Sequence, residues 1–219
     1  MRSFIQACLA SVAFTAGADY DNTESGALWG AQGDDENSLC QTGKEQSPID
    51  LTNATYQEGI SISLTGYNTL DEVSYSDADF TTTTGFDDAY KNRAVFTVVP
   101  PEGEDEGKGP YYPLQFHFHA PSENSIDGKL KDAEMHIVHT NDDGELAVIG
   151  ILFEESTEEN DFLAAFQETP DLAQGKFKDL IDDLDLTRYW TFKGSLTTPP
   201  CTEGLRWTVL KQVQPISNA

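Results

Sequence analysis

Positive charge, cysteine, histidine and long apolar runs are all scarce in this chain. Against 38 aspartates and glutamates there are only 13 lysines and arginines, so the formal net charge is −25 over 219 residues. Nucleic acids and anionic membrane surfaces are therefore poor partners, because both would repel the protein. Beyond residue 18, no apolar run approaches the roughly 18 residues that a membrane-spanning helix needs, so we expect no membrane span.

The first 18 residues differ in character from the rest. Arg2 gives a positive start, residues 4–14 are mostly apolar, and Ala-Gly-Ala at residues 16–18 fits a small-residue cleavage site. This pattern is typical of a secretory signal peptide, although a buried N-terminal helix would also explain the apolar residues. Its removal would delete Arg2 and no acidic residue, taking the net charge from −25 to −26. We expect a secreted or extracytoplasmic protein with a single domain over residues 19–219.

Only three cysteines are present, and Cys8 lies in the expected signal peptide. Cys40 and Cys201 remain as an even pair in a chain expected to be secreted, which favours a disulfide. That bond would close a loop of about 160 residues and contribute about 4–5 kcal/mol in a chain-entropy treatment. Asn53, in Asn-Ala-Thr, matches the acceptor pattern for N-glycosylation, a short pattern that also occurs by chance.

Short β-rich segments dominate the hydrophobic pattern. Residues 60–64 alternate, residues 94–99 and 146–153 are apolar runs of buried-strand length, and residues 207–213 also predict a strand. Residues 161–166 and 177–184 have helical spacing with acidic flanks. Residues 100–113 hold four prolines, three glycines and four acidic residues and are expected to form a surface loop. The chain is thus predicted to be mostly β, with a few short surface helices.

All four histidines fall in one stretch. His117 and His119 belong to Gln-Phe-His-Phe-His at residues 115–119, and His136 and His139 belong to Ala-Glu-Met-His-Ile-Val-His at residues 133–139. Alternate side chains share a face of a β-strand, so His117 and His119 point together, whereas His139 points away from His136. Sixteen residues lie between His119 and His136, which suits a loop and a return strand. Three imidazoles can then meet across one strand pair.

Three neutral nitrogens with one open position are typical of catalytic zinc. Alternating His and Phe is also compatible with ordinary strand packing, but the third histidine favours a metal. Each ligand histidine needs a partner on its second ring nitrogen. Gln115 lies two residues before His117 on the same face, and Glu134 stands in the same relation to His136. We interpret His139, on the other face, as a core histidine.

These motifs resemble the α-class carbonic anhydrases. Besides residues 115–119 and 133–136, the resemblance rests on Gln-Ser-Pro-Ile-Asp at residues 46–50, Ser-Glu at 122–123 and Gly-Ser-Leu-Thr-Thr-Pro-Pro at 194–200. The motifs follow the family order, and the resemblance spans about residues 29–216. It implies a large, mainly antiparallel central sheet with zinc at the base of a conical cleft. It also implies the reversible hydration of CO₂ to bicarbonate and a proton.

The resemblance further implies roles for individual residues. His117, His119 and His136 would hold Zn²⁺, and zinc-bound hydroxide would attack CO₂. Thr197 would accept a hydrogen bond from that hydroxide, donate one to an ionised Glu123, and so orient the nucleophile. The substrate pocket would be formed by Val138, Val148, Leu196, Thr198, Leu205 and Trp207.

Three features depart from the family pattern. Asn124 stands where a histidine commonly follows Ser-Glu, which costs a packing or hydrogen-bonding group but no ligand. The C-terminal segment is shorter than usual, and in the family that segment supplies a backbone carbonyl to the middle ligand histidine, here His119. No histidine remains as a proton shuttle, because residues 79–88, where one would fall, hold carboxylates, threonines, a glycine and a phenylalanine.

Two other functions are compatible with the sequence. A carbonic-anhydrase-like protein with low turnover would serve as an acidic extracellular binding or matrix protein. A structural zinc site in an extracellular binding module fits less well, because structural zinc normally has four protein ligands. The intact histidine triad, together with Glu123 and Thr197, favours the enzyme. No sequence pattern sets the oligomeric state.

We predict that salt stabilises this protein. The many acidic side chains repel one another at low ionic strength. Salt screens this repulsion, because the Debye length falls from about 30 Å at 0.01 M to about 3 Å at 1 M salt. The midpoint of thermal unfolding should therefore rise from low ionic strength to molar NaCl, as circular dichroism can measure. A flat or falling midpoint would instead favour a role of the acidic residues in binding divalent cations, or no special role.

Overall fold

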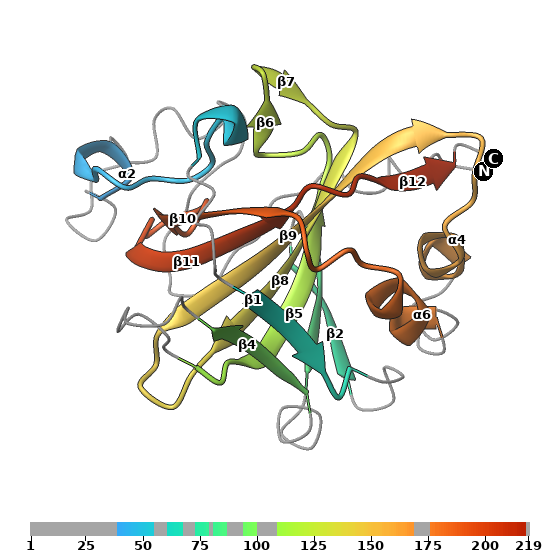
Figure 1. The fold of residues 1–219 in the computed structure, drawn as a ribbon, viewed down its shortest axis with the longest axis horizontal. Helices are drawn as coiled ribbons and strands as arrows, with labels where there is room; N and C mark the ends of the chain where they lie inside the picture. The colour runs from blue at the N-terminus through green and yellow to red at the C-terminus, as the bar shows by residue number, and fades with distance from the viewer. Residues whose placement is uncertain are drawn as a thin grey trace.

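The computed structural model describes residues 39–54, 61–67, 73–78, 81–86, 94–99, 109–168 and 176–217. The expected mostly β architecture is confirmed, with strands predominating over short helices (Figure 1). The strands are β1 Ser61–Thr65, β2 Val73–Ala78, β3 Thr81–Phe86, β4 Val95–Val99, β5 Tyr112–His119, β6 Ser125–Ile126, β7 Lys129–Leu130, β8 Ala133–Thr140, β9 Leu146–Ser156, β10 Tyr189–Ser195, β11 Glu203–Leu210 and β12 Gln214–Ser217. The helices are α2 Leu39–Thr42, the 3₁₀ helix η3 Leu51–Asn53, α4 Asp161–Glu168 and α6 Phe177–Asp182.

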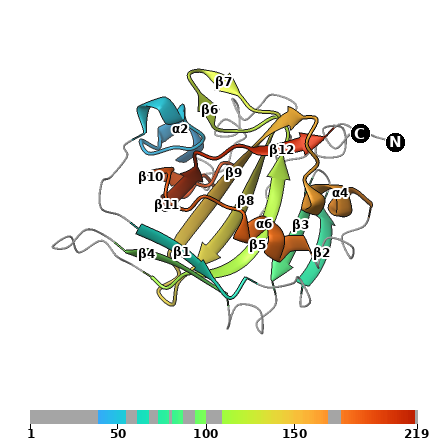
Figure 2. The ribbon, with the colours of Figure 1, turned by 45° about the vertical axis from the view of Figure 1, so that its right-hand side comes forward.

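An eight-stranded sheet occupies the centre of the molecule (Figures 1 and 2). Its strands follow the order β10-β11-β9-β8-β5-β3-β2, and β12 pairs with β9 outside this path. The pairs that β9 forms with β11 and β12 are parallel, and the remaining pairs of this sheet are antiparallel. The sheet is therefore mixed but mainly antiparallel, as predicted. β1 and β4 form a separate antiparallel ribbon, and β6 and β7 form a short hairpin.

The two faces of the central sheet are buried in different ways. Alternation along β8 sends Met135 to one face and His136 to the other. The Met135 face belongs to an aromatic-rich core, in which Phe116 of β5 stacks on Phe177 of α6 with ring centroids 5.3 Å apart. Phe162 of α4 also contacts Phe116, so α4 and α6 cover this face (Figure 2). The opposite face of the sheet carries His117, His119 and His136.

Most predicted segments are found, with shifted ends. The apolar run at residues 146–153 forms β9, which continues to Ser156 because its last residues pair with β12. Segments 60–64 and 94–99 correspond to β1 and β4, and segments 161–166 and 177–184 to α4 and α6. The strand predicted at residues 207–213 begins earlier, at Glu203, and ends at Leu210.

The prediction of a surface loop at residues 100–113 is wrong at its C-terminal end. Residues 100–108 lie outside the described part of the chain, but Tyr111 is buried and exchanges two backbone hydrogen bonds of 2.9 Å with Phe96. β5 begins at Tyr112. Pro113 is accommodated because the register between β5 and β8 shifts between Pro113 and Gln115, where proline is tolerated in a strand.

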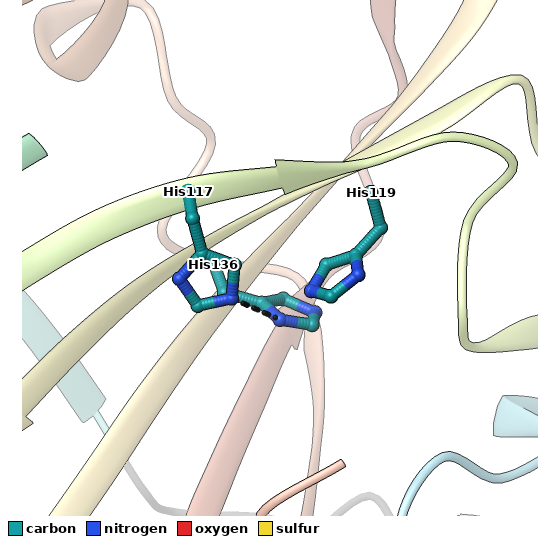
Figure 3. A group of neighbouring side chains, drawn as sticks. All are labelled: His117, His119 and His136. Atoms are coloured by element: carbon teal, nitrogen blue, oxygen red, sulfur yellow. Dashed lines mark hydrogen bonds between the residues drawn. The ribbon is translucent and has the colours of Figure 1, made fainter. Parts of the chain in front are cut away.

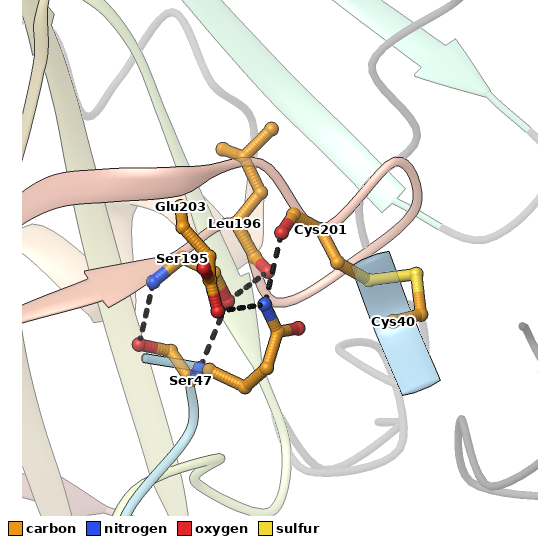
Figure 4. Close-up of a disulfide and its surroundings, with 7 residues drawn as sticks. Cys40, Ser47, Ser195, Leu196, Cys201 and Glu203 are labelled. Carbon is orange, nitrogen blue, oxygen red and sulfur yellow. Dashed lines mark hydrogen bonds between the residues drawn. A yellow bond between two sulfur atoms is a disulfide. The ribbon is translucent and has the colours of Figure 1, made fainter. Parts of the chain in front are cut away.

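A disulfide joins the N-terminal region to the loop after β10 (Figure 4). Cys40 and Cys201 are bonded across a sequence separation of 161 residues, which confirms the predicted pair. Nearby, Gln46 Nε2 donates to the Cys201 carbonyl at 3.1 Å. The backbone N–H of Ser47 donates to Ser195 Oγ at 2.9 Å, and the N–H of Ser195 donates to Ser47 Oγ at 3.1 Å. Residues 40–47 therefore hold both ends of the loop at residues 195–201.

Two sequence predictions remain without a structural test. The proposed signal peptide at residues 1–18 lies outside the described residues. Asn53 closes η3, but its side chain is not among those described, so glycosylation stays a prediction. In the described ranges, no helix has the length and apolar character needed to cross a membrane.

We predict that the double variant Cys40→Ala/Cys201→Ala is less stable than the wild type by up to about 4–5 kcal/mol, since it frees a long loop in the unfolded chain. Denaturant unfolding measures the difference, and mass spectrometry of non-reduced peptides tests the bond directly. Two free thiols in the secreted protein would contradict the pairing.

Candidate metal centre

Three histidine side chains converge on the face of the sheet opposite the aromatic core (Figure 3). His117 of β5 pairs directly with His136 of β8 across the antiparallel ladder, and His119 lies two residues further along β5. One ring nitrogen from each histidine lies within 4.8 Å of the other two. His117 Nε2 and His136 Nδ1 are 3.2 Å apart, close to the roughly 3.3 Å expected for two nitrogens bound to one tetrahedral metal ion.

The chemistry of these nitrogens also fits a metal ion. All three rings are buried, and His119 Nε2 has no hydrogen-bond partner among the described residues. Burial, followed by the charges of His119 and His136, holds the pKa of His117 well below its usual value. Burial and His136 likewise lower the pKa of His119. His117 and His119 are therefore neutral at physiological pH, which is the form that binds metals.

The predicted outer partners lie beside the triad. Gln115 Oε1 accepts a hydrogen bond of 2.7 Å from His117 Nδ1, which leaves Nε2 of that ring free to bind a metal. Glu134 Oε1 lies 3.1 Å from His136 Nε2, so His136 presents Nδ1 instead. These contacts fix which nitrogen of each ring faces the common centre.

Glu134 is a fully buried carboxylate surrounded by N–H donors. The backbone N–H groups of Glu123 and Asn124 donate to Glu134 Oε2 at 3.0 and 2.8 Å, and Asn124 Nδ2 donates to Oε1 at 2.7 Å. Burial alone would raise the pKa of Glu134, but His136 and these donors hold it below its usual range. The expectation that Asn124 costs a hydrogen-bonding group is therefore wrong, because its amide supplies one.

Glu123 lies between the triad and the loop after β10. Its carboxylate accepts a hydrogen bond from the Thr197 side chain, and Oε1 lies 3.4 Å from His119 Nδ1. Burial raises the pKa of Glu123 to about 7, although His136 and the Thr197 hydrogen bond act in the opposite direction. A metal cation at the triad would favour the ionised form further. Glu123 Oε1 thus lies beside the second ring nitrogen of His119.

A pocket opens next to the triad, and its wall is largely apolar. Val138 faces Val148 across β8 and β9, and Trp207 of β11 also pairs with Val148, so three apolar side chains form one row across the sheet. The lining consists of Gln115, His117, His136, Val138, Val148, Leu196, Thr197, Thr198 and Trp207. Leu205, which was expected in the wall, is buried in the cluster around Trp207 and is not part of this lining.

His139 does not take part in the site. Its ring is fully buried on the other face of β8, and Nε2 lies 2.5 Å from the Tyr67 hydroxyl. Burial lowers the pKa of His139 to about 3, so the ring stays neutral. The interpretation of His139 as a core histidine is confirmed. Of the region proposed for a proton shuttle, residues 79–88, the structure describes the side chain of Phe86, which is buried.

A buried histidine triad that opens onto a largely apolar pocket is typical of a catalytic metal site, since structural zinc normally has four protein ligands. Comparison with known proteins agrees. The profile of eukaryotic-type carbonic anhydrases matches residues 26–219. A carbonic anhydrase of Klebsiella pneumoniae is 33% identical over 213 residues, which cover 94% of this chain and 81% of that protein.

Solved structures give the same result. The α-carbonic anhydrase of Thermovibrio ammonificans, determined with the inhibitor sulfanilamide, is 30% identical with a TM-score of 0.72, covering 93% of this chain and 87% of that one. A halotolerant carbonic anhydrase of Dunaliella salina is 26% identical with a TM-score of 0.72, covering 93% and 86%. The chain belongs to the eukaryotic-type carbonic anhydrase family, whose members interconvert CO₂ and bicarbonate.

We predict one zinc ion per chain, bound by the three converging histidines. Replacing His117, His119 or His136 with alanine should remove most of the metal, because two nitrogens and water bind zinc far more weakly than three nitrogens. His139→Ala is the matched control, a buried histidine on the same strand as His136 whose loss should leave zinc in place. Mass spectrometry measures the zinc content of the ligand variants and of the control. Full zinc occupancy in His136→Ala would overturn the assignment.

Proposed function

We propose that this protein catalyses the zinc-dependent, reversible hydration of CO₂ to bicarbonate and a proton. The observation that supports this most strongly is the spacing of His117 Nε2 and His136 Nδ1, 3.2 Å apart, at the edge of an apolar pocket. In this family, zinc lowers the pKa of a coordinated water to about 7, so that hydroxide is available at neutral pH. The residues of this chain would then place CO₂, orient the nucleophile and hold the ligands.

The pocket wall suits a small neutral substrate. CO₂ has no net charge, and binding it beside a metal requires a surface from which water is easily displaced. Val138, Val148, Leu196 and Trp207 supply that surface within the pocket lining. Thr198 lines the same pocket and offers a polar contact to the bicarbonate product.

Thr197 is the orienting group in this proposal. Its hydrogen bond to Glu123 uses the hydroxyl hydrogen, because an ionised carboxylate only accepts. The oxygen of Thr197 is then left as an acceptor facing the pocket, and a nucleophile that donates to it has its lone pair directed at the substrate. Glu123 therefore acts through Thr197, and Gln115 and Glu134 act through the ligand histidines.

We also propose a secreted or extracytoplasmic location with removal of residues 1–18. The Cys40–Cys201 disulfide supports an oxidising compartment. The similarity to a carbonic anhydrase described as halotolerant, together with the acidic composition, supports salt tolerance as the role of the charge. Asn53 remains a proposed glycosylation site of the secreted form.

We predict that Thr197→Ala lowers kcat/KM for CO₂ hydration by about 100-fold while zinc stays bound, because it removes orientation and not the nucleophile. Thr202→Ala is the matched control, since this threonine lies in the same loop with an exposed side chain. Stopped-flow hydration and metal analysis of both variants check the prediction. Equal kcat/KM in Thr197→Ala and the wild type would mean that Thr197 is only a turn residue and does not orient the nucleophile.

We predict that proton release limits kcat. All four histidines are accounted for, and an unperturbed aspartate with a pKa of about 3.9 is a poor acceptor from a donor near 7. Raising the concentration of an imidazole buffer should therefore increase kcat until chemistry becomes limiting, with a smaller effect on kcat/KM. A high kcat that does not respond to buffer would mean that another group transfers the proton.

A further inference from the structure

Asn124 reaches the metal centre through Glu134 and does not contact the ligand histidines itself. It is fully buried and does not line the pocket. Two of the three N–H groups that donate to Glu134 belong to it, namely its backbone N–H and its side-chain amide. Glu134 in turn lies 3.1 Å from His136 Nε2.

The orientation of the Asn124 amide is set from the other side. Its Oδ1 accepts a hydrogen bond of 3.1 Å from the backbone N–H of Ile49, so Nδ2 must face Glu134. The Asn124 carbonyl accepts a hydrogen bond of 2.7 Å from Ser122 Oγ, which fixes the backbone of the same residue. Neither end of the amide is free to turn, so Asn124 is a fixed donor.

The carboxylate of Glu134 has little room to move for the same reason. A Cβ atom added at Gly150, on the neighbouring strand β9, would lie 3.1 Å from Glu134 Oε1, a tight contact that would require this oxygen to shift by a few tenths of an ångström. Oε1 is therefore confined between the Asn124 amide, the backbone of β9 and the ring of His136. Its position determines which nitrogen of His136 is free to face His117.

We propose that Asn124 is a positioning residue of the metal centre, which fixes Glu134 and thereby holds Nδ1 of His136 at the metal. The proposal rests on the proposed zinc function. Without the Asn124 amide, Glu134 Oε1 loses its 2.7 Å donor and can turn away from His136, and the imidazole loses its fixed orientation. Removing such outer partners typically weakens metal binding by about 10–100-fold.

The test compares zinc affinity in Asn124→Leu with that in a matched control, Asn141→Leu. Asn141 is also a buried asparagine whose Oδ1 accepts from backbone N–H groups and whose Nδ2 donates to a carboxylate, that of Glu145. It lies five residues beyond His136 and does not contact the triad. Both variants should lose stability, as thermal unfolding of the zinc-free proteins will show, because both leave backbone N–H groups unpaired.

The two variants should differ in metal binding. We expect the zinc dissociation constant, measured by competition with a chelating indicator, to rise about 10–100-fold in Asn124→Leu and to stay unchanged in Asn141→Leu. The visible spectrum of the cobalt-substituted protein should change in Asn124→Leu alone, because it reports ligand geometry. Asn124→His, which retains an N–H donor and introduces the family's usual residue, should restore affinity close to that of the wild type.

Asn124→Ser removes the same amide with less disturbance of packing and replaces Asn124→Leu if that variant does not fold. Wild-type zinc affinity and an unchanged cobalt spectrum in the folded variant would overturn the proposal and leave Asn124 a purely structural residue. A wild-type protein that binds no zinc would instead refute the proposed function, so the two failures are distinct.

Discussion

The burial of three imidazoles beside the Glu134 carboxylate is the constraint on which the rest of this structure depends. Removing these groups from water is costly unless each polar atom finds a partner. Gln115 accepts a hydrogen bond from the outer nitrogen of His117, and Glu134 Oε1 lies 3.1 Å from the outer nitrogen of His136. Glu134 itself accepts hydrogen bonds from three N–H groups. The inner nitrogens are left to face one another, an arrangement that a metal ion stabilises and that neutral rings alone do not.

Much of this arrangement could be predicted from the sequence because strand alternation is a local rule. The two-residue period placed His117 and His119 on one face and His139 on the other, and a single antiparallel pairing then brought His136 opposite His117. The same rule placed Gln115 and Glu134 beside their histidines. The apolar run that forms β9 was also clear, since a strand buried on both faces needs no alternation.

The remainder depends on contacts between residues far apart in the chain. Asn124 accepts from Ile49, 75 residues away, and composition gives no sign of that contact. Tyr111 was assigned to a loop because residues 100–113 are rich in proline and glycine. In the structure it is buried, because it pairs with Phe96 through the backbone and packs against the Phe96 ring. Leu205 was expected in the pocket, but alternation along β11 does not say how deep in the cluster a side chain lies.

The most direct test of the central claim is to measure zinc content and CO₂ hydration on the same purified sample. Stopped-flow turnover is recorded as prepared, after removal of metal by a chelator, and after zinc is restored. We expect about one zinc per chain, loss of turnover in proportion to the zinc removed, and full recovery when zinc is returned. Turnover that persists without zinc, or a zinc-loaded protein that does not hydrate CO₂, would contradict the account.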